Sequence, residues 1–295
     1  MRTPESYGYD RYLRSKRTVD DRALNPGVLD AILSSLPTDR ALRIVELGGG
    51  IGTMVDRLVE SGRIARADYL LVDAEASFLE EAETLAPKWR VGETRHGSSA
   101  GVSFEVSTRH ARLEPWLDED GARFDLIIAH AVLDLVDTRS VLPQVLGRLA
   151  DGGLFWPTIN FDGDTIFVPP DPRDAALLEA YHRSMDERTI DGRPAGSSTA
   201  GRELFTHIVE AGGSIVRAGS SDWVVFAGET GYAGDEAYFL HHIVHTVEEE
   251  LKSHPELGAM VQAWGRERHA QVESGALVYI AHQLDFAVRR GYGVR

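Results

Sequence analysis

The segment RIVELGGGIGTMVDRL, from Arg43 to Leu58, joins a short apolar run to an amphipathic stretch through a cluster of glycines. The run at 41–47 contains β-branched residues, as buried strands do, and apolar side chains recur at helical spacing over 53–62. Glycine adopts positive φ and lets other groups approach where a Cβ would collide. The segment therefore predicts a strand, a tight loop that something approaches closely, and a helix.

Composition limits the possible functions. The chain has 295 residues, of which 43% are hydrophobic and 26% charged, as in soluble globular proteins. The absence of cysteine excludes disulfides and thiolate chemistry. A net charge of −15 disfavours a nucleic-acid partner. We find no signal peptide and no apolar run long enough to span a membrane, so a cytoplasmic protein acting on a small molecule is expected.

The first half of the chain alternates apolar strands with amphipathic helices. Such alternation implies a parallel sheet covered by helices on both faces. Ligands of these sheets bind at the carboxyl ends of the strands, where the strand order reverses. Strands are expected at 41–47, 67–74, 101–109, 123–137 (ending in a loop and a short helix) and 154–162, and helices at 53–62, 75–86 and 141–153.

After Asp162 the pattern changes. A helix is expected at 173–187, a further core helix at 199–213 with Thr199 as its cap, and a sixth strand at 214–228 that is interrupted at Gly219. The apolar run at 275–290 is the best candidate for a final strand. Residues 229–274 between them are then a mostly helical insertion.

The glycine pattern separates two kinds of cofactor. Nicotinamide and flavin enzymes use G-x-G-x-x-G, but Thr53 or Val55 stands at the third glycine position in the two possible registers. The pattern present is E-x-G-x-G-x-G, which begins with Glu46. An acidic residue ahead of the loop would repel a pyrophosphate and suits a cationic ligand. A nicotinamide-dependent dehydrogenase is therefore the less favoured enzyme class.

Four spaced motifs carry a resemblance to a known family. They are ELGGGIG, LLVDAE, FDLIIAHAVL and LADGGLFW, within about residues 40–162. With these four motifs in this order, the sequence resembles the class I S-adenosylmethionine-dependent methyltransferases. The resemblance implies an α/β, Rossmann-like three-layer sandwich with a mostly parallel seven-stranded sheet, a final antiparallel strand and helical insertions. It also implies S-adenosyl-L-methionine as cofactor.

The resemblance also implies which residues hold the cofactor. Asp73 corresponds to the acid that binds the ribose hydroxyls, although an Asp at a strand end can simply cap a helix. Glu46 is placed to attract the ammonium group, and the glycines bring the backbone close. The expected cofactor-binding residues are Arg17, Glu46, Gly48, Gly50, Gly52, Asp73, Ala74, His110, Ala111 and His130.

Two of these assignments have alternatives. The family usually has an acid where His110 stands, so either His110 accepts the adenine hydrogen bond or the backbone of Ala111 makes it. Arg17, with Lys16 as second choice, is expected to bind the cofactor's carboxylate from an N-terminal segment that folds over the site. The alternative for this segment is a solvated amphipathic helix.

The implied reaction is in-line displacement of a methyl group from a sulfonium, for which positioning provides most of the rate. A general base is needed only when the acceptor is protonated, as a hydroxyl is. The candidates are His130 after the fourth strand, Asp162 after the fifth, and His182 on the helix at 173–187. His130 could equally stack near the cofactor or bond the backbone.

The expected organisation has four parts: an N-terminal helical cofactor lid (1–39), a cofactor-binding core (40–228), a helical insertion acting as substrate lid or dimer contact (229–274), and a final core strand (275–295). His241, His245 and Glu249 are spaced for a metal, a substrate cleft or neither, and no metal is expected. The sequence predicts O- or N-methylation of a small molecule and a possible homodimer. The alternative is a non-catalytic S-adenosylmethionine-binding sensor or partner subunit.

Overall fold

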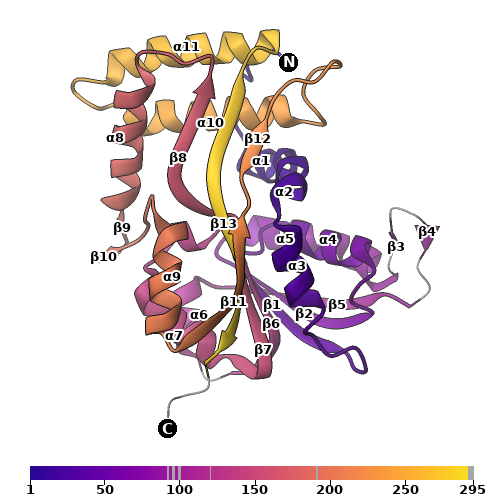
Figure 1. The fold of residues 1–295 in the computed structure, drawn as a ribbon. Helices are drawn as coiled ribbons and strands as arrows, with labels where there is room; N and C mark the ends of the chain where they lie inside the picture. Colours follow the sequence, from indigo (N-terminus) through magenta and orange to yellow (C-terminus); the bar gives the residue numbers. More distant parts are fainter. Residues whose placement is uncertain (92, 95–96, 99–100, 120, 191, 292–295) are drawn as a thin grey trace.

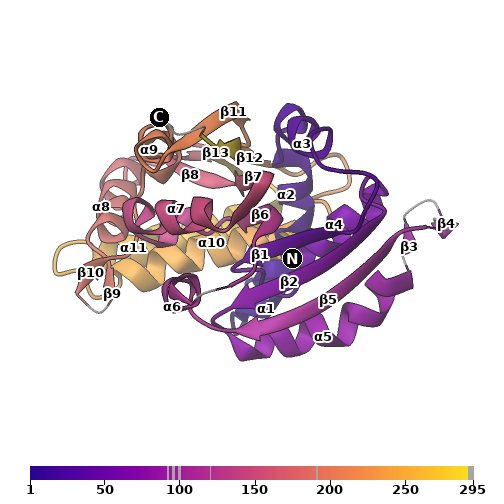
Figure 2. The ribbon, with the colours of Figure 1, turned by 90° about the horizontal axis from the view of Figure 1, so that it is seen from below.

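The computed structural model describes residues 1–91, 93–94, 97–98, 101–119, 121–190 and 192–291. Its main sheet has the strand order β11-β13-β7-β6-β1-β2-β5 (Figures 1 and 2). All pairs are parallel except those of β13, which is antiparallel to β7 and β11. These strands are β1 (Leu42–Leu47), β2 (Arg66–Asp73), β5 (Ser103–His110), β6 (Phe124–His130), β7 (Leu149–Thr158), β11 (Gly213–Ser220) and β13 (Val278–Arg290).

Helices cover both faces of this sheet, so the predicted three-layer fold is confirmed (Figure 2). One face packs on α3 (Pro26–Leu33), α4 (Thr53–Ser61) and α5 (Ala76–Val91). The other packs on α6 (Leu113–Asp118), α7 (Thr138–Gly147) and α9 (Ala200–Glu210). Every residue of β6 is buried, as expected for a central parallel strand between two layers.

The fifth strand differs from the sequence-based expectation. The predicted helix at 141–153 ends early, and β7 already begins in its second half. Ile159, at φ +57, then turns the chain, and a separate strand, β8 (Asn160–Val168), follows. The buried carboxylate of Asp285 holds this turn by accepting the backbone N–H of Ile159 at 2.7 Å. One predicted strand over 154–162 is therefore two strands in different parts of the sheet.

An antiparallel part of the same sheet extends upward from these strands. In it, β13 lies between β8 and β12 (Trp223–Val225), so the predicted strand at 214–228 is broken at 221–222 rather than at Gly219. We call β8, β12, the first half of β13 and the helices packed on them the upper lobe (Figure 1). These helices are α8 (Asp174–Asp186), α10 (Glu236–Leu251) and α11 (Gly258–Ser274).

The upper lobe draws residues from two of the expected parts of the chain. Residues of β8, α8 and β12, such as Phe167, Leu177 and Val225, share a hydrophobic cluster with the helices of the 229–274 insertion. The apolar stripe of α10, which includes Leu240, Val244 and Val247, is buried inside this cluster. The stripe is therefore satisfied within one chain and is not free to contact a second subunit.

The remaining elements are short. The N-terminal segment forms α1 (Tyr9–Ser15) and α2 (Arg17–Ala23), and a 3-10 turn, η1 (Leu133–Leu135), follows β6. Two small hairpins pair β3 (Glu93–Thr94) with β4 (Gly97–Ser98), and β9 (Thr189–Ile190) with β10 (Arg193–Pro194). Within the described residues, no helix is both long enough and apolar enough to cross a lipid bilayer.

Candidate functional site

The glycine loop lies at the carboxyl end of β1, between β2 and β6, where the strand order reverses. The N–H groups of Gly48 and Gly49 donate to the carbonyl oxygen of Val72 at 2.8 and 3.2 Å, which ties the loop to the end of β2. This is the crevice in which open α/β sheets bind their ligands.

Side chains of the chain itself approach the glycines. A Cβ on Gly48, which has φ +66, would lie 2.6 Å from Val132 in the segment after β6. A Cβ on Gly52, at φ +83, would lie 2.5 Å from the ring of Trp89 on α5. Real Cβ atoms do not come so close, so both positions require glycine for packing as well as for backbone conformation.

Glu46 is buried beneath the loop. One of its carboxylate oxygens accepts the hydroxyl hydrogen of Tyr69 at 2.7 Å, and its carboxyl lies 3.3 Å from where a Cβ on Gly49 would stand. Burial raises the pKa of Glu46 to about 8, although the bond from Tyr69 and the charge of Arg57 act in the opposite direction. A buried acid with a raised pKa is a group that a cationic ligand would stabilise.

Asp73 ends β2 beside the loop. Its Oδ2 accepts the N–H of Gly50 at 2.8 Å, and its Oδ1 accepts the N–H of Glu75 at 2.9 Å just before α5. Asp73 therefore has a capping role, and it also orders the glycine loop. A carboxylate can accept about four hydrogen bonds, so each oxygen keeps capacity for a ligand hydroxyl.

His110 and Ala111, which are expected to bind adenine, make hydrogen bonds within the chain. The ring of His110, at the end of β5, lies 2.9 Å from the carbonyl oxygen of Ala74, so its Nε2–H donates there. The N–H of Ala111 donates to the carbonyl of Asp73 at 2.9 Å. The ring nitrogen Nδ1 of His110 and the carbonyl of Ala111 are the groups left for a ligand.

Arg17 lies on α2 and binds carboxylates of α4. Its guanidinium lies 2.9 Å from Asp56 and 2.7 Å from Glu60. Lys16, the second choice, is buried, and its ammonium lies 3.1 Å from Asp20. Both cations hold the N-terminal helices in place, so neither presents an unpaired charge at the glycine loop.

Asp20 is the centre of a buried polar cluster that the sequence did not indicate. Burial alone would raise the pKa of Asp20, but Lys16, His130 and Arg57 lower it below its ordinary value. Its Oδ2 lies 2.9 Å from His130 Nε2 and 3.4 Å from Arg57. Its Oδ1 accepts the indole N–H of Trp223 at 2.9 Å. The cluster joins α2, α4, β6 and β12.

His130 therefore faces an acid. Burial lowers its pKa to about 4, against the opposing effect of Asp20, so the ring is neutral at physiological pH. The neutral ring donates its Nε2–H to the ionised Asp20, which leaves the Nδ1 lone pair free. Nδ1 is buried and has no hydrogen-bonding partner among the described residues. An imidazole oriented by a carboxylate through one nitrogen is arranged to accept a proton at the other.

The structure does not bring Asp162 and His182 to His130. Asp162 Oδ1 accepts both the backbone N–H and the Nε–H of Arg202, at 2.7 and 2.8 Å, at the start of α9. His182 on α8 lies 3.2 Å from the hydroxyl of Thr165 on β8. Both side chains belong to the region where β8 meets its helices.

His241, His245 and Glu249 do not converge. His241 Nδ1 lies 2.8 Å from Nδ1 of His269 on α11, the ring of His245 stacks on Tyr7, and Glu249 pairs with Lys252. No group of three potential metal ligands is found in the described parts of the chain.

The N-terminal helices lie across the glycine loop. A Cβ placed on Gly50 would lie 3.3 Å from Cδ1 of Leu13 on α1. Tyr9 stacks on Phe78 of α5, while Tyr12 stacks on His242 of α10 with ring centroids 4.2 Å apart. The segment thus bridges the glycine loop and the upper lobe.

Asp134 in η1 is a second acid that the sequence did not single out. Burial raises its pKa, and its Oδ1 has no hydrogen-bonding partner within the described residues. Its charge, with that of Asp73, contributes to the raised pKa of Tyr9, after burial. Asp134 therefore lies within electrostatic reach of the helix that covers the glycine loop.

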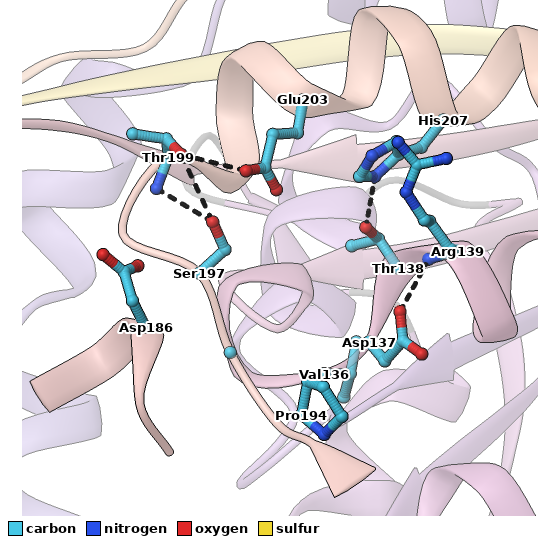
Figure 3. Close-up of a pocket in the computed structure, with 11 residues that line it drawn as sticks. Val136, Asp137, Thr138, Arg139, Asp186, Pro194, Ser197, Thr199, Glu203 and His207 are labelled. Atoms are coloured by element: carbon cyan, nitrogen blue, oxygen red, sulfur yellow. Dashed lines mark hydrogen bonds between the residues drawn. The ribbon is translucent and has the colours of Figure 1, made fainter. Parts of the chain in front are cut away.

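A polar cavity of about 430 Å³ lies beside η1, between α7, α9 and the end of β10 (Figure 3). Thr138 and His207 face each other across one wall, with Oγ1 and Nδ1 2.7 Å apart. The Ser197 N–H donates to the carbonyl of Asp134 at 3.2 Å, which ties the loop that lines this cavity to η1.

No family model matches the chain. The chain is 32% identical over 124 residues to trans-aconitate 2-methyltransferase of Azoarcus sp. (strain BH72), a stretch that covers 42% of this chain and 41% of the relative. The chain thus matches less than half of that relative's length. Over this stretch the match confirms the resemblance to methyltransferases that the motifs indicated.

Two solved structures are similar over most of the chain. One is an S-adenosylmethionine-dependent methyltransferase from Thiobacillus denitrificans in complex with S-adenosyl-L-homocysteine (15% identity, TM-score 0.48, covering 98% of this chain and 100% of that one). The other is geranyl diphosphate C-methyltransferase from Streptomyces coelicolor A3(2) (13% identity, TM-score 0.49, covering 97% and 87%).

Proposed function

We propose that this chain is an S-adenosylmethionine-dependent methyltransferase that acts on a small molecule in the cytoplasm. The observation that carries the proposal is the pairing of a buried acid, Glu46, with a glycine loop whose order depends on Asp73. A pyrophosphate would gain nothing from the neutral form of Glu46 and would be repelled by the ionised form, whereas a ligand with an ammonium group and a ribose would be bound by both acids. The 32% identity to a methyltransferase over 124 residues supports the same conclusion.

Each proposed cofactor contact uses a group that can still bind a ligand. Asp73 has acceptor sites left for the two ribose hydroxyls, and charge strengthens such bonds. The ammonium group stabilises the ionised form of Glu46. Because the pKa of Glu46 is about 8 without ligand, binding at lower pH releases a proton. The affinity is therefore expected to rise with pH up to about 8.

The dyad of Asp20 and His130 suits an acceptor that must lose a proton. S-adenosylmethionine supplies an electrophilic methyl group on a sulfonium sulfur. Asp20 fixes the ring of His130 through Nε2, and Nδ1 can take the proton of a hydroxyl or an amine. We propose O- or N-methylation on this basis, with Asp162 and His182 assigned to the approach of the acceptor rather than to proton transfer.

Calorimetric titration with S-adenosyl-L-homocysteine tests the cofactor. We expect a micromolar dissociation constant that Asp73→Asn weakens by about 10- to 100-fold, the usual cost of losing a charged hydrogen-bonding partner. Asp68→Asn is the matched control, because Asp68 is exposed on the same strand. Binding of a nicotinamide dinucleotide in place of S-adenosyl-L-homocysteine would refute the proposal.

Transfer of labelled methyl groups to a panel of phenols, carboxylic acids and amines tests the reaction. With an accepted substrate, His130→Ala should lower the turnover rate by about two to four powers of ten while the cofactor affinity stays unchanged. A mutant rate near wild type between pH 6 and 9 would remove His130 from catalysis. Cofactor binding with no transfer to any acceptor would favour the sensor or partner-subunit alternative.

A further inference from the structure

The two carboxylate oxygens of Asp20 have very different surroundings. Oδ2 faces three nitrogens: Nε2 of His130 at 2.9 Å, Nζ of Lys16 at 3.1 Å and the guanidinium of Arg57 at 3.4 Å. Oδ1 accepts the indole N–H of Trp223 at 2.9 Å, and this is its only hydrogen bond within the described residues. Asp20 is completely buried, so water does not replace any of these partners. The indole is therefore the sole restraint on one end of the carboxylate.

The upper lobe fixes the position of Trp223. This residue begins β12, pairs with Ala281 of β13 and is buried. Its ring packs edge-on against Phe239 of α10, with ring centroids 5.3 Å apart and ring planes at 89°. The helix α2, which carries Asp20, contacts β12 (Figure 1). An indole that is itself held by packing can hold a carboxylate in one orientation.

Two groups with opposite requirements lie at Nε2 of His130. Asp20 Oδ2, at 2.9 Å, is an acceptor, so a bond to it requires a proton on Nε2. Nη1 of Arg57, at 3.5 Å, is a donor and can bond Nε2 only when that nitrogen carries a lone pair. A neutral imidazole has one ring proton, so the bond to Asp20 leaves Nδ1 free to accept a proton, whereas the bond to Arg57 places the ring proton on Nδ1. The partner of Nε2 therefore decides whether His130 can act as a base.

We propose that Trp223 is a positioning residue that selects the tautomer of His130 in which Nδ1 is free. The indole holds Oδ1 of Asp20 and so keeps Oδ2 on Nε2. Without the indole N–H, Oδ1 is a buried acceptor that lacks a partner, which is costly. The carboxylate then turns Oδ1 toward the two cations, its bond to Nε2 weakens, and Arg57 bonds Nε2 instead. The inference rests on the proposed role of His130 as the base, and it makes that role depend on a residue of the upper lobe.

The two cations keep Asp20 ionised but do not orient it. Against the effect of burial, the charges of Lys16 and Arg57 lower the pKa of Asp20. An ammonium group is a point charge, which attracts a carboxylate in any rotation. The guanidinium of Arg57 is bound through Nε to Asp21 at 2.5 Å, so it does not follow Asp20 alone. The indole N–H has one donor direction, and the hydrogen bond weakens steeply away from it. Orientation of the carboxylate therefore depends on Trp223.

Nitrogen NMR of the ligand-free full chain, with isotope-labelled histidine rings, tests the tautomer directly. In the wild type we expect the ring proton of His130 on Nε2, with the signals identified by their loss in His130→Gln. In Trp223→Phe the ratio of the Nδ1–H form to the Nε2–H form should rise by about 10- to 100-fold, the effect of losing a hydrogen bond to a charged group. Trp264→Phe is the matched control, because Trp264 also donates its indole N–H to a carboxylate, Asp174 Oδ1 at 2.7 Å, elsewhere in the upper lobe. It should leave the ratio unchanged.

A double variant separates tautomer selection from a general loss of packing. Arg57→Met removes the competing donor, so Trp223→Phe/Arg57→Met should return the ring proton to Nε2. A folded Trp223→Phe with an unchanged ratio, or a double variant that keeps the ratio of Trp223→Phe, would overturn the inference. If Trp223→Phe does not fold, the wild type alone decides, because a ring proton on Nδ1 would overturn the inference.

The NMR measurements use neither cofactor nor acceptor, so they are independent of the proposed reaction. A chain that shows the expected tautomers but does not bind S-adenosyl-L-homocysteine would refute the proposed function and not the selection of the tautomer. Conversely, a chain that binds S-adenosyl-L-homocysteine and carries the ring proton of His130 on Nδ1 would overturn the role of Trp223 and leave the cofactor assignment in place.

Discussion

Replacing Glu46 with glutamine is expected to stabilise the free protein while it weakens the proposed cofactor site. Burial raises the pKa of Glu46 from 4.5 to about 8, so the native state holds a proton that the unfolded chain releases above pH 4.5. The stability linked to this proton is complete below pH 4.5 and is lost as the pH rises toward 8. Glutamine cannot ionise, and its carbonyl can still accept the hydrogen bond from Tyr69.

The magnitude follows from the shift. Because the unfolded chain ionises at a lower pH than the native state, the shift lowers the free energy of unfolding by roughly 3 kcal/mol at pH 7. At pH 5 it lowers this free energy by less than about 1 kcal/mol. Glu46→Gln should therefore raise the free energy of unfolding by about 3 kcal/mol at pH 7, with the gain nearly absent at pH 5. Binding of S-adenosyl-L-homocysteine should weaken by about 10- to 100-fold, because the charged partner of the ammonium group is gone.

Urea unfolding of the ligand-free protein at pH 5 and pH 7 measures the first effect, and calorimetry measures the second. Glu105→Gln is the matched control, since Glu105 is an exposed glutamate on β5 and should change neither quantity. A glutamine variant that is no more stable than wild type at pH 7, or a gain that does not depend on pH, would refute the description of Glu46 as a buried acid with a raised pKa.

Three further substitutions probe other parts of the site. Asp20→Asn leaves Lys16 and Arg57 without their buried partner, and should lower the free energy of unfolding in urea by about 3–5 kcal/mol at pH 7. Because the pKa of Asp20 is lowered in the native state, this loss should shrink below pH 4. A loss that does not depend on pH would contradict the cluster. Gly52→Ala should cost about 1–3 kcal/mol, since φ is +83 and the new Cβ meets Trp89; unchanged thermal stability would argue against that contact. Asp285→Ala frees two backbone N–H groups and should cost about 2 kcal/mol or more, and hydrogen exchange that stays slow near Ile159 would show that another group holds the turn.

Local patterns in the sequence were sufficient to predict that the glycine loop, Glu46 and Asp73 lie together. The strand, the glycines and the helix after them are adjacent in sequence, and Asp73 follows at the end of the next strand, so periodicity and spacing place them together. The split of the predicted strand at 154–162 depends on a different kind of information. Ile159 turns because Asp285, far along the chain, holds its N–H.

The same reason explains what the sequence left out of the proposed catalytic site. Asp20 and His130 are separated by 110 residues and come from elements that share no pattern. Asp20 follows a short basic stretch, where alternating charges are typical of a solvated helix. Only the packing of α2 against β12, beside the end of β6, removes this acid from water and makes it the orienting partner of the imidazole. Local periodicity carries no signal for such a contact.

The position of β13 has a consequence for how the molecule is made. This strand is the last of the described elements to be synthesised, yet it lies between β7 and β11 in the main sheet and between β8 and β12 in the upper lobe. Until residues 278–290 have left the ribosome, β7 is an open strand edge and neither part of the sheet is complete. Nascent chains that end before β13 are therefore expected to need a chaperone, which would shield that edge from pairing with another chain.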